Sequence, residues 1–128
     1  MKEFMLLIRN EKDSKAGFSA EQHQEFVTKC TVYIGKLMDE KRLLSSQPLI
    51  REGKIISNPN GVWKEGPFNE SKEVIVGYYH ILAKDMDEAI EIAKKNPEFA
   101  YTPDARVEVR PIKMREESIS YDYPGANK

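Results

Sequence analysis

The stretch that most limits what this chain can fold into is residues 73–83, "EVIVGYYHILA". Successive side chains of a β-strand point to opposite faces of a sheet, so this run divides into two sets. One set is Val74, Val76, Tyr78, His80 and Leu82, and the other is Ile75, Gly77, Tyr79, Ile81 and Ala83. Both sets are largely apolar, which predicts a central strand that is covered on both faces.

The residues near the start of the chain predict a strand and a long helix. Residues 4–9, "FMLLIR", form an apolar run of the length of a buried strand. Ser19 and Gln22 have the spacing of a capping box, so a helix is expected from there to residues 42–44. Cys30 lies among the apolar residues of this helix and is interpreted as a small apolar side chain. These residues recur at helical spacing: Phe26, Val27, Cys30, Tyr33, Ile34, Leu37 and Met38.

The segment between that helix and the central strand is rich in turn-forming residues. Residues 45–48 are predicted to turn the chain, and residues 49–56, "LIREGKII", to form two short strands about a Glu-Gly turn. Residues 57–71 hold several Asn, Pro, Gly and Ser residues and predict a long loop. Trp63 within this loop is interpreted as a plug over the core.

The second half of the chain predicts one more helix and one more strand. Asp85 is a candidate N-cap, and the apolar spacing after it predicts a helix that ends at Asn96-Pro97. Residues 106–112 alternate charged and apolar side chains and contain a proline, which is typical of an edge strand. Residues 115–128 show no periodicity and are expected to be a disordered tail or an arm that packs on a partner.

The order strand, helix, strand, strand, helix, strand predicts a ferredoxin-like βαββαβ domain of the α+β class over residues 1–114. Right-handed crossovers place both helices on one face of an antiparallel sheet and leave the other face bare. Because the central strand is apolar on both sides, the bare face needs a cover. A second copy of the chain is the expected cover, so we expect a homodimer.

Charge and cysteine content disfavour several classes of protein. With 20 Lys and Arg against 21 Asp and Glu, the net charge is −1, and no overall field favours nucleic acid or anionic lipid. The single cysteine forms no internal disulfide, and no Cys/His cluster offers a metal site, so we expect a reducing cytoplasm and no cofactor. Membrane insertion is not expected, because no apolar stretch approaches the ~20 residues that span a bilayer. Residues 4–8 are too short for a signal peptide.

Five short motifs link the chain to a known family: Gly66-Pro67-Phe68, Lys72-Glu73, Gly77-Tyr78-Tyr79, Asp87-Glu88-Ala89 and Val107-Glu108-Val109-Arg110-Pro111. Over residues 1–114 the chain resembles the YCII-related family, in particular its DGPF branch. The resemblance implies a dimeric α+β barrel, in which two ferredoxin-like sheets pack bare face to bare face. It implies no general reaction, since a few relatives are dehalogenating or lyase-like enzymes and others lie beside regulatory genes.

Two residues are candidates for acid–base catalysis. Glu65 lies beside a Gly-Pro pair in a predicted loop, and a loop carboxylate that is partly desolvated is suited to proton transfer. The alternative is a structural carboxylate that accepts backbone N–H groups or pairs with Lys72. His80 belongs to the residue type that titrates near neutral pH. The alternative for His80 is a hydrogen-bonded residue of the core or of an interface.

Arg110, Glu108 and Arg9 are the main candidates for ligand binding. Glu108 and Arg110 share one face of the last strand, and Arg9 is expected on the same face of the sheet. An arginine binds a carboxylate through two parallel hydrogen bonds, so the cluster is interpreted as a clamp for an anionic ligand. The alternative is an ion pair across strands or between subunits. Tyr78, on the face of His80, is a further candidate for the wall of the same cleft.

The sequence therefore supports two functions of different classes. The first is an enzyme or binding protein that holds a small polar or anionic molecule in a cleft of a homodimeric barrel. The second is a non-catalytic interaction or regulatory module without a small-molecule substrate. No motif names a reaction, so catalysis itself is left open.

Overall fold

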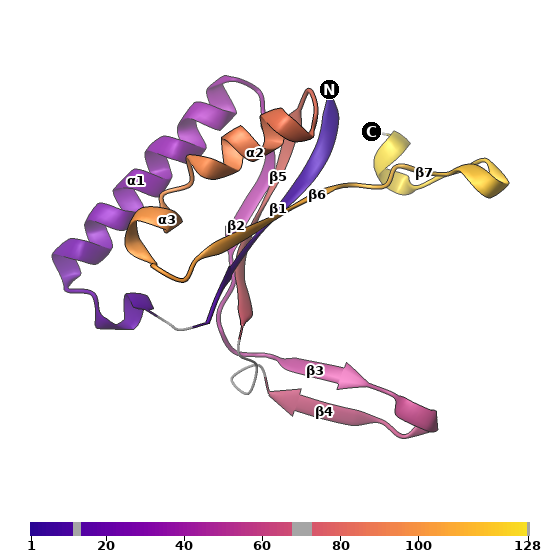
Figure 1. The fold of residues 1–128 in the computed structure, drawn as a ribbon, viewed down its shortest axis with the longest axis horizontal. Helices are drawn as coiled ribbons and strands as arrows, with labels where there is room; N and C mark the ends of the chain where they lie inside the picture. The colour runs from indigo at the N-terminus through magenta and orange to yellow at the C-terminus, as the bar shows by residue number, and fades with distance from the viewer. Residues whose placement is uncertain (12–13, 68–72, 128) are drawn as a thin grey trace.

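The computed structural model describes residues 1–11, 14–67 and 73–127 (Figure 1). Four strands form an antiparallel sheet in the order β2-β5-β1-β6: β1 (Lys2–Asn10), β2 (Leu43–Pro48), β5 (Val74–Ala83) and β6 (Arg106–Pro111). Two helices, α1 (Ala20–Asp39) and α2 (Met86–Lys94), lie on the same face of this sheet. This order and pairing confirm the predicted ferredoxin-like α+β fold.

The remaining elements are short. The helix α3 (Glu98–Tyr101) follows α2, and two small hairpins are formed by β3 (Lys54–Ser57) with β4 (Lys64–Pro67) and by β7 (Arg115–Glu116) with β8 (Tyr121–Asp122). Single turns of 3-10 helix are η1 (Ser14–Gly17), η2 (Pro59–Gly61), η4 (Glu117–Ile119) and η5 (Pro124–Asn127).

The core lies between the helices and the sheet. Side chains of β1 and β5 alternate into it, and the two helices supply the opposite layer. Tyr33 of α1 contacts both β5 and α2. Its ring meets the ring of Tyr79 on β5 edge-on at a centroid distance of 5.5 Å, and its hydroxyl donates to the carbonyl of Ile92 on α2 at 2.7 Å. The buried cluster is Phe4, Leu6, Ile8, Tyr33, Leu37, Tyr79, Ile81, Ala83, Ala89 and Ala93.

Both predicted helix starts are confirmed. The Ser19 hydroxyl accepts from the Gln22 N–H at 3.1 Å, and the Gln22 side chain accepts from the Ser19 N–H at 2.9 Å. These reciprocal bonds satisfy donors that the first turn of α1 leaves free. At the start of α2 the Asp85 carboxylate accepts from the Glu88 N–H at 2.9 Å.

The predicted end of α1 at residues 42–44 is wrong, because the helix ends at Asp39. Lys41 has a left-handed φ of 57°. Its N–H donates to the Met38 carbonyl at 3.0 Å, and the Arg42 N–H donates to the Leu37 carbonyl at 2.8 Å. These two bonds form a Schellman motif, which closes a helix and satisfies its last carbonyls.

The segment before the central strand differs from its prediction. Residues 45–48 are not a turn but belong to β2, which pairs with β5 at the edge of the sheet. The two strands predicted within residues 49–56 are wrong, because the hairpin lies later, between β3 and β4. Its turn includes Asn60 with φ 53° and Gly61 with φ 80°, conformations that these residue types adopt most readily. Trp63 is 71% exposed, so its interpretation as a plug over the core is also wrong.

A bulge changes which side chains of β5 face the core. Ile8 pairs with Gly77 whereas Arg9 pairs with Ile75, so β5 contains one extra residue at this point. The predicted alternation holds from Tyr78 to Ala83. Val74 is buried and Ile75 is 37% exposed opposite Arg9, so the grouping of Val74 with Tyr78 and of Ile75 with Tyr79 is wrong.

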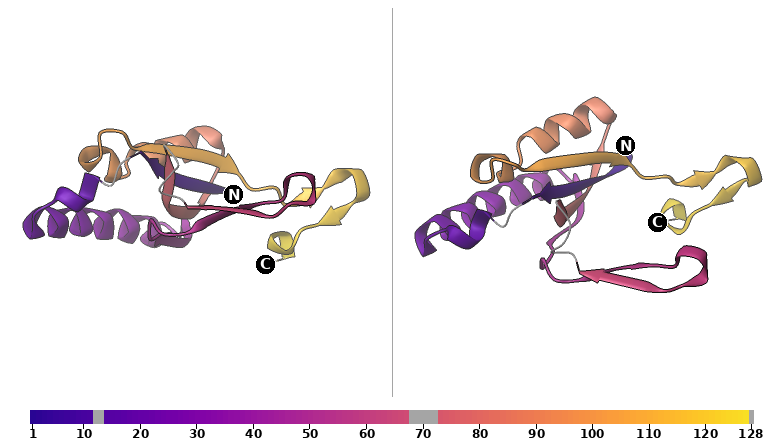
Figure 2. Two further views of the ribbon diagram at one scale, coloured as in Figure 1. Left: turned by 90° about the horizontal axis from the view of Figure 1, so that it is seen from below. Right: turned by 60° about the horizontal axis from the view of Figure 1, so that its bottom comes forward.

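Two arms leave the body on the side of the sheet away from the helices (Figures 1 and 2). The hairpin arm comprises residues 54–67, with β3 and β4, and the tail arm comprises residues 113–127, with β7 and β8. Each arm packs chiefly on itself. In Figure 2 both arms extend in the same direction, beyond the sheet.

Candidate functional site

A cavity of about 650 Å³ lies between α1 and the end of the sheet at which β1 ends and β5 begins. Gly77 allows β2 to approach β5 here, since a Cβ atom at this position would lie 3.3 Å from the Gln47 carbonyl oxygen. The volume is in the range of small-molecule sites. Its apolar lining includes Ile8, Phe26, Cys30, Ile34, Val76 and Tyr79.

A buried ion pair forms part of the cavity wall. Lys15, on η1, places its ammonium 2.5 Å from a carboxylate oxygen of Glu98, which is 5% exposed. The Thr102 hydroxyl donates to the same oxygen at 3.2 Å. The ammonium also lies 4.5 Å from the centre of the Phe26 ring, a cation–π contact. Glu98 is therefore a compensated buried charge.

Two buried asparagines lie in the same wall. Asn10 ends β1 and accepts a hydrogen bond from the Arg51 guanidinium at 2.5 Å. Asn96, 4% exposed, accepts a hydrogen bond from the Glu98 N–H at 2.9 Å through its side-chain oxygen. Its side-chain nitrogen, Nδ2, is buried and forms no hydrogen bond of good geometry within the described residues, although the Asn96 side chain interacts with the phenols of Tyr33 and Tyr79 and opposes the rise in their pKa that burial causes. Buried donors are nearly always paired in proteins, so an acceptor of better geometry would stabilise this one.

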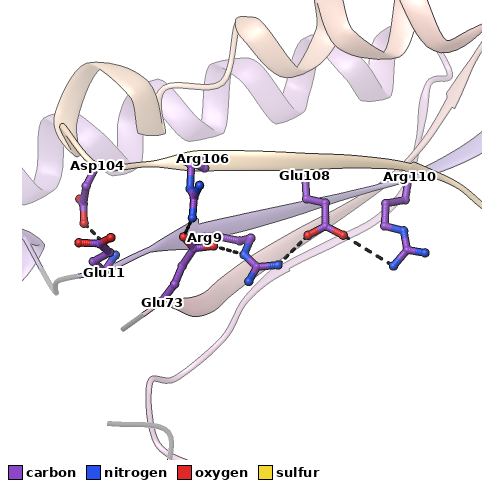
Figure 3. A network of polar contacts seen from close by, with 7 residues as sticks. All are labelled: Arg9, Glu11, Glu73, Asp104, Arg106, Glu108 and Arg110. Carbon is purple, nitrogen blue, oxygen red and sulfur yellow. Dashed lines mark hydrogen bonds and ion pairs between the residues drawn. The ribbon is translucent and has the colours of Figure 1, made fainter. Parts of the chain in front are cut away.

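The residues predicted to clamp an anion lie on the sheet face without helices, which we call the bare face. They belong to a chain of ion pairs that we call the ionic row (Figure 3). Arg9 pairs with Glu73 and, at 2.6 Å, with Glu108, whose second oxygen lies 3.6 Å from Arg110. Arg106 completes the row by pairing with Glu73. The predicted placement of Arg9, Glu108 and Arg110 on one sheet face is confirmed.

A second cavity, of about 380 Å³, lies along the ionic row and is lined by Arg9, Glu73, Arg106, Val107 and Glu108. Each arginine of this cavity already contacts a carboxylate. A ligand role for Arg9, Glu108 and Arg110 stays a prediction.

Tyr78 and His80 also lie on the bare face, as predicted. Tyr78 pairs with Leu7 and His80 with Met5, so apolar side chains separate both residues from the ionic row. The His80 imidazole lies 2.6 Å from the carboxylate of Glu3. Neither residue lines the larger cavity. A role of His80 in catalysis stays a prediction.

Glu65 is separate from all of these residues. It lies on the hairpin arm, and its exposed carboxylate is 3.3 Å from the ammonium of Lys54. The alternative pairing of Glu65 with Lys72 involves a residue of the segment 68–72, which lies outside the described residues. The structure thus brings five of the six candidates to one sheet face and places Glu65 on an arm.

Comparison with known proteins identifies the family. The family model of the YCII-related domain matches residues 2–114. The chain belongs to the YCII-related family. No curated protein matches it. Among the described residues of this YCII-related protein, no helix is long and apolar enough to cross a bilayer, and no three His, Cys, Asp or Glu side chains gather as a metal site.

Burial sets the protonation states of the cavity wall in this YCII-related protein. Burial, and then the charge of Glu98, raises the pKa of Cys30 to about 11. Burial also raises the pKa of Tyr79 to about 12. Both groups are neutral near pH 7, so the wall presents a thiol and a phenol. The interpretation of Cys30 as a small apolar side chain agrees with this state.

The polar residues of the cavity were not among the candidates that sequence patterns indicated. Asn96 was used only as a helix stop, and Asn10, Lys15 and Glu98 were not singled out. The available signal was one asparagine, Asn10, directly after the apolar run of β1 and a second, Asn96, two residues after the end of α2. Polar residues at the ends of neighbouring elements often meet in space, although their partners lie far apart in sequence.

Proposed function

We propose that this YCII-related protein binds a small molecule in the cavity between α1 and the sheet. The ligand has an apolar body, which fits the lining of Ile8, Phe26 and Ile34, and a head that accepts hydrogen bonds. The observation that carries the proposal is the buried Nδ2 of Asn96 in the wall of this cavity, which interacts with the phenols of Tyr33 and Tyr79 but forms no hydrogen bond of good geometry within the described residues. A ligand oxygen within reach of this atom removes the cost of an unpaired buried donor.

The charges of the wall favour an anionic head. Lys15 and Arg51 are cationic, and Glu98 is the anion that Lys15 already compensates. Arg51 donates to a neutral amide, so its charge is not cancelled by Asn10. A small aromatic or aliphatic carboxylate combines the apolar body with such a head.

We further propose that the protein is a member of the DGPF branch and resides in the cytoplasm. The branch is supported by the motifs Gly66-Pro67-Phe68 and Val107-Glu108-Val109-Arg110-Pro111. The cytoplasmic location is supported by a single, free cysteine in a chain that uses no disulfide.

We also propose a homodimer in which two bare faces meet. Met5, Leu7 and Leu82 are partly buried on this face, with Leu7 opposite Tyr78, Met5 opposite His80 and Leu82 opposite Glu3. Apolar side chains on a sheet face without helices are typical of an interaction surface. In a symmetric dimer each copy presents the same patch to the other.

Binding is tested with anilinonaphthalene sulfonate, a fluorescent probe with an apolar aromatic body and an anionic head. Val27→Trp adds bulk to the cavity wall, and Val32→Trp is the matched control on the exposed side of α1. We expect saturable probe binding that Val27→Trp weakens at least about 10-fold, or about 1.4 kcal/mol, and Val32→Trp leaves unchanged. Equal affinity in the two variants would place the probe elsewhere and contradict the proposal.

The head group is tested by competition. Benzoate and benzyl alcohol share an aromatic ring and differ in charge. We expect benzoate to displace the probe at a concentration at least about 10-fold lower, because only benzoate offers a charged acceptor to Asn96, Lys15 and Arg51. Equal displacement by the two compounds would argue against an anionic head. Absence of saturable probe binding would instead favour an interaction module.

A further inference from the structure

The two arms expose apolar side chains that their own hairpins do not cover. Ile55 and Ile56 are successive residues of β3, so they point to opposite faces of the hairpin, yet they are 49% and 64% exposed. Trp63 is 71% exposed in the same arm. Ile119 and Tyr121 of the tail arm are 71% and 49% exposed. A two-stranded hairpin is at best marginally stable alone in water, so the hairpin arm gains from a surface to pack on.

We propose that the hairpin arm of each chain packs against a second copy of this chain, so that two copies hold each other through exchanged arms. The inference rests on the proposed meeting of two bare faces and adds a second area of contact to it. Both arms project beyond the sheet on the side away from the helices (Figures 1 and 2). A second copy bound to the bare face is therefore close enough for both arms to contact it.

The charge pattern of the bare face favours a second copy over other partners. Along the ionic row the charges alternate in the order Arg106, Glu73, Arg9, Glu108 and Arg110. A row of alternating sign is complementary to an inverted copy of itself when the two rows are offset by one residue. A uniformly anionic partner such as nucleic acid would meet the carboxylates of Glu73 and Glu108 directly. Only a partner that offers both signs matches this face.

The single tryptophan of the chain reports the contact directly. Trp63 lies on the hairpin arm and is 71% exposed in one copy. When the arm packs on a second copy, the fluorescence emission of Trp63 should shift to shorter wavelength, and the added quencher acrylamide should quench Trp63 less. We expect both signals to revert on dilution, at the same protein concentration at which sedimentation shows dissociation.

A double variant tests whether the arm holds the dimer. We expect Ile56→Lys with Trp63→Lys to raise the dimer dissociation constant at least about 100-fold, because each copy loses two buried apolar contacts. Val32→Lys, on the exposed side of α1, is the matched control and should dimerise like the wild type. Circular dichroism checks that all three proteins are folded.

The outcomes separate this inference from the dimer on which it rests. Dimerisation with Trp63 exposed at every concentration would overturn the role of the arms and leave the bare-face dimer standing. A monomer at all accessible concentrations would overturn both. Equal dissociation constants for the double variant and Val32→Lys would also count against the arms.

Discussion

The reactivity of Cys30 gives a quantitative test of the cavity wall. Burial, and secondly the charge of Glu98, raises the pKa of this thiol from its ordinary value of 9.0 to about 11, while Lys15 opposes the shift. Only the thiolate attacks a disulfide reagent. Because the chain has one cysteine, every labelling event reports this position. The test therefore compares the folded protein with the protein unfolded in urea, in which the thiol of Cys30 is exposed to water.

The expected difference in rate follows from the two pKa values of Cys30. At pH 8 a thiol with a pKa of 9.0 is about 9% thiolate, whereas one with a pKa of about 11 is about 0.1% thiolate, roughly 100-fold less. The more basic thiolate is intrinsically more nucleophilic, and a Brønsted coefficient of about 0.4–0.5 restores roughly 6- to 10-fold. The folded protein should therefore react about 10-fold more slowly than the unfolded chain, before any loss of access.

The assay follows the absorbance of the thiopyridone that neutral dithiodipyridine releases, in buffer and in urea. The rate in buffer should rise with pH beyond about 9 without a plateau, since the folded pKa is about 11. Cys30→Ser should release nothing, and saturation with anilinonaphthalene sulfonate should slow the wild type further. Equal rates in buffer and urea, or a plateau below about pH 9, would refute a partly buried, neutral Cys30.

Two further predictions concern stability. Leu6→Ala should lower the free energy of unfolding by about 2–5 kcal/mol, because Leu6 is fully buried. Leu7→Ala should lower the free energy of unfolding of one chain by less, because Leu7 lies on the opposite face and is only partly buried. Equal losses in urea titrations would contradict the assigned faces. The Lys84 backbone N–H and then Arg42 lower the pKa of Glu88 below 4.5. This stabilisation is complete above pH 4.5 and is lost as pH falls through the folded pKa. Glu88→Gln should therefore flatten the decline of stability at acid pH, and an unchanged pH profile would contradict this.

The parts of the fold that the sequence predicts are those with local causes. The bonds between Ser19 and Gln22 join residues three apart, so the pattern alone locates the helix start. The end of the same helix depends on Lys41 in a left-handed conformation, which a lysine adopts rarely. A glycine at that position would have marked the end, whereas a lysine gives no signal.

The errors in the sheet have non-local causes. β2 carries Ser45, Ser46 and Gln47, which lack apolar alternation because an edge strand is held by its backbone bonds to β5. The bulge in β5 is fixed by pairing with β1, far away in sequence, so alternation alone placed Val74 and Ile75 on the wrong faces.

The cavity escaped prediction for the same reason. Lys15 and Glu98 form one ion pair across most of the chain, and Arg51 reaches Asn10 from the segment after β2. Each of these residues is of a common residue type, and its sequence neighbours form no motif that would single it out. The bare-face candidates were easier to find, since the alternation of β6 already places Glu108 and Arg110 side by side.

Alternation along β1 separates the proposed ligand cavity from the proposed dimer face. Ile8 faces the cavity, and its neighbours Leu7 and Arg9 face the bare side, so a change at one set leaves the other set in place. The exception is the segment after β2. Leu49 and Arg51 line the cavity, and the hairpin arm begins at residue 54. A ligand that fixes Arg51 and a partner that fixes the arm would act on the same short stretch of backbone, and by linkage any effect of the ligand on the affinity for the partner equals the effect of the partner on the affinity for the ligand.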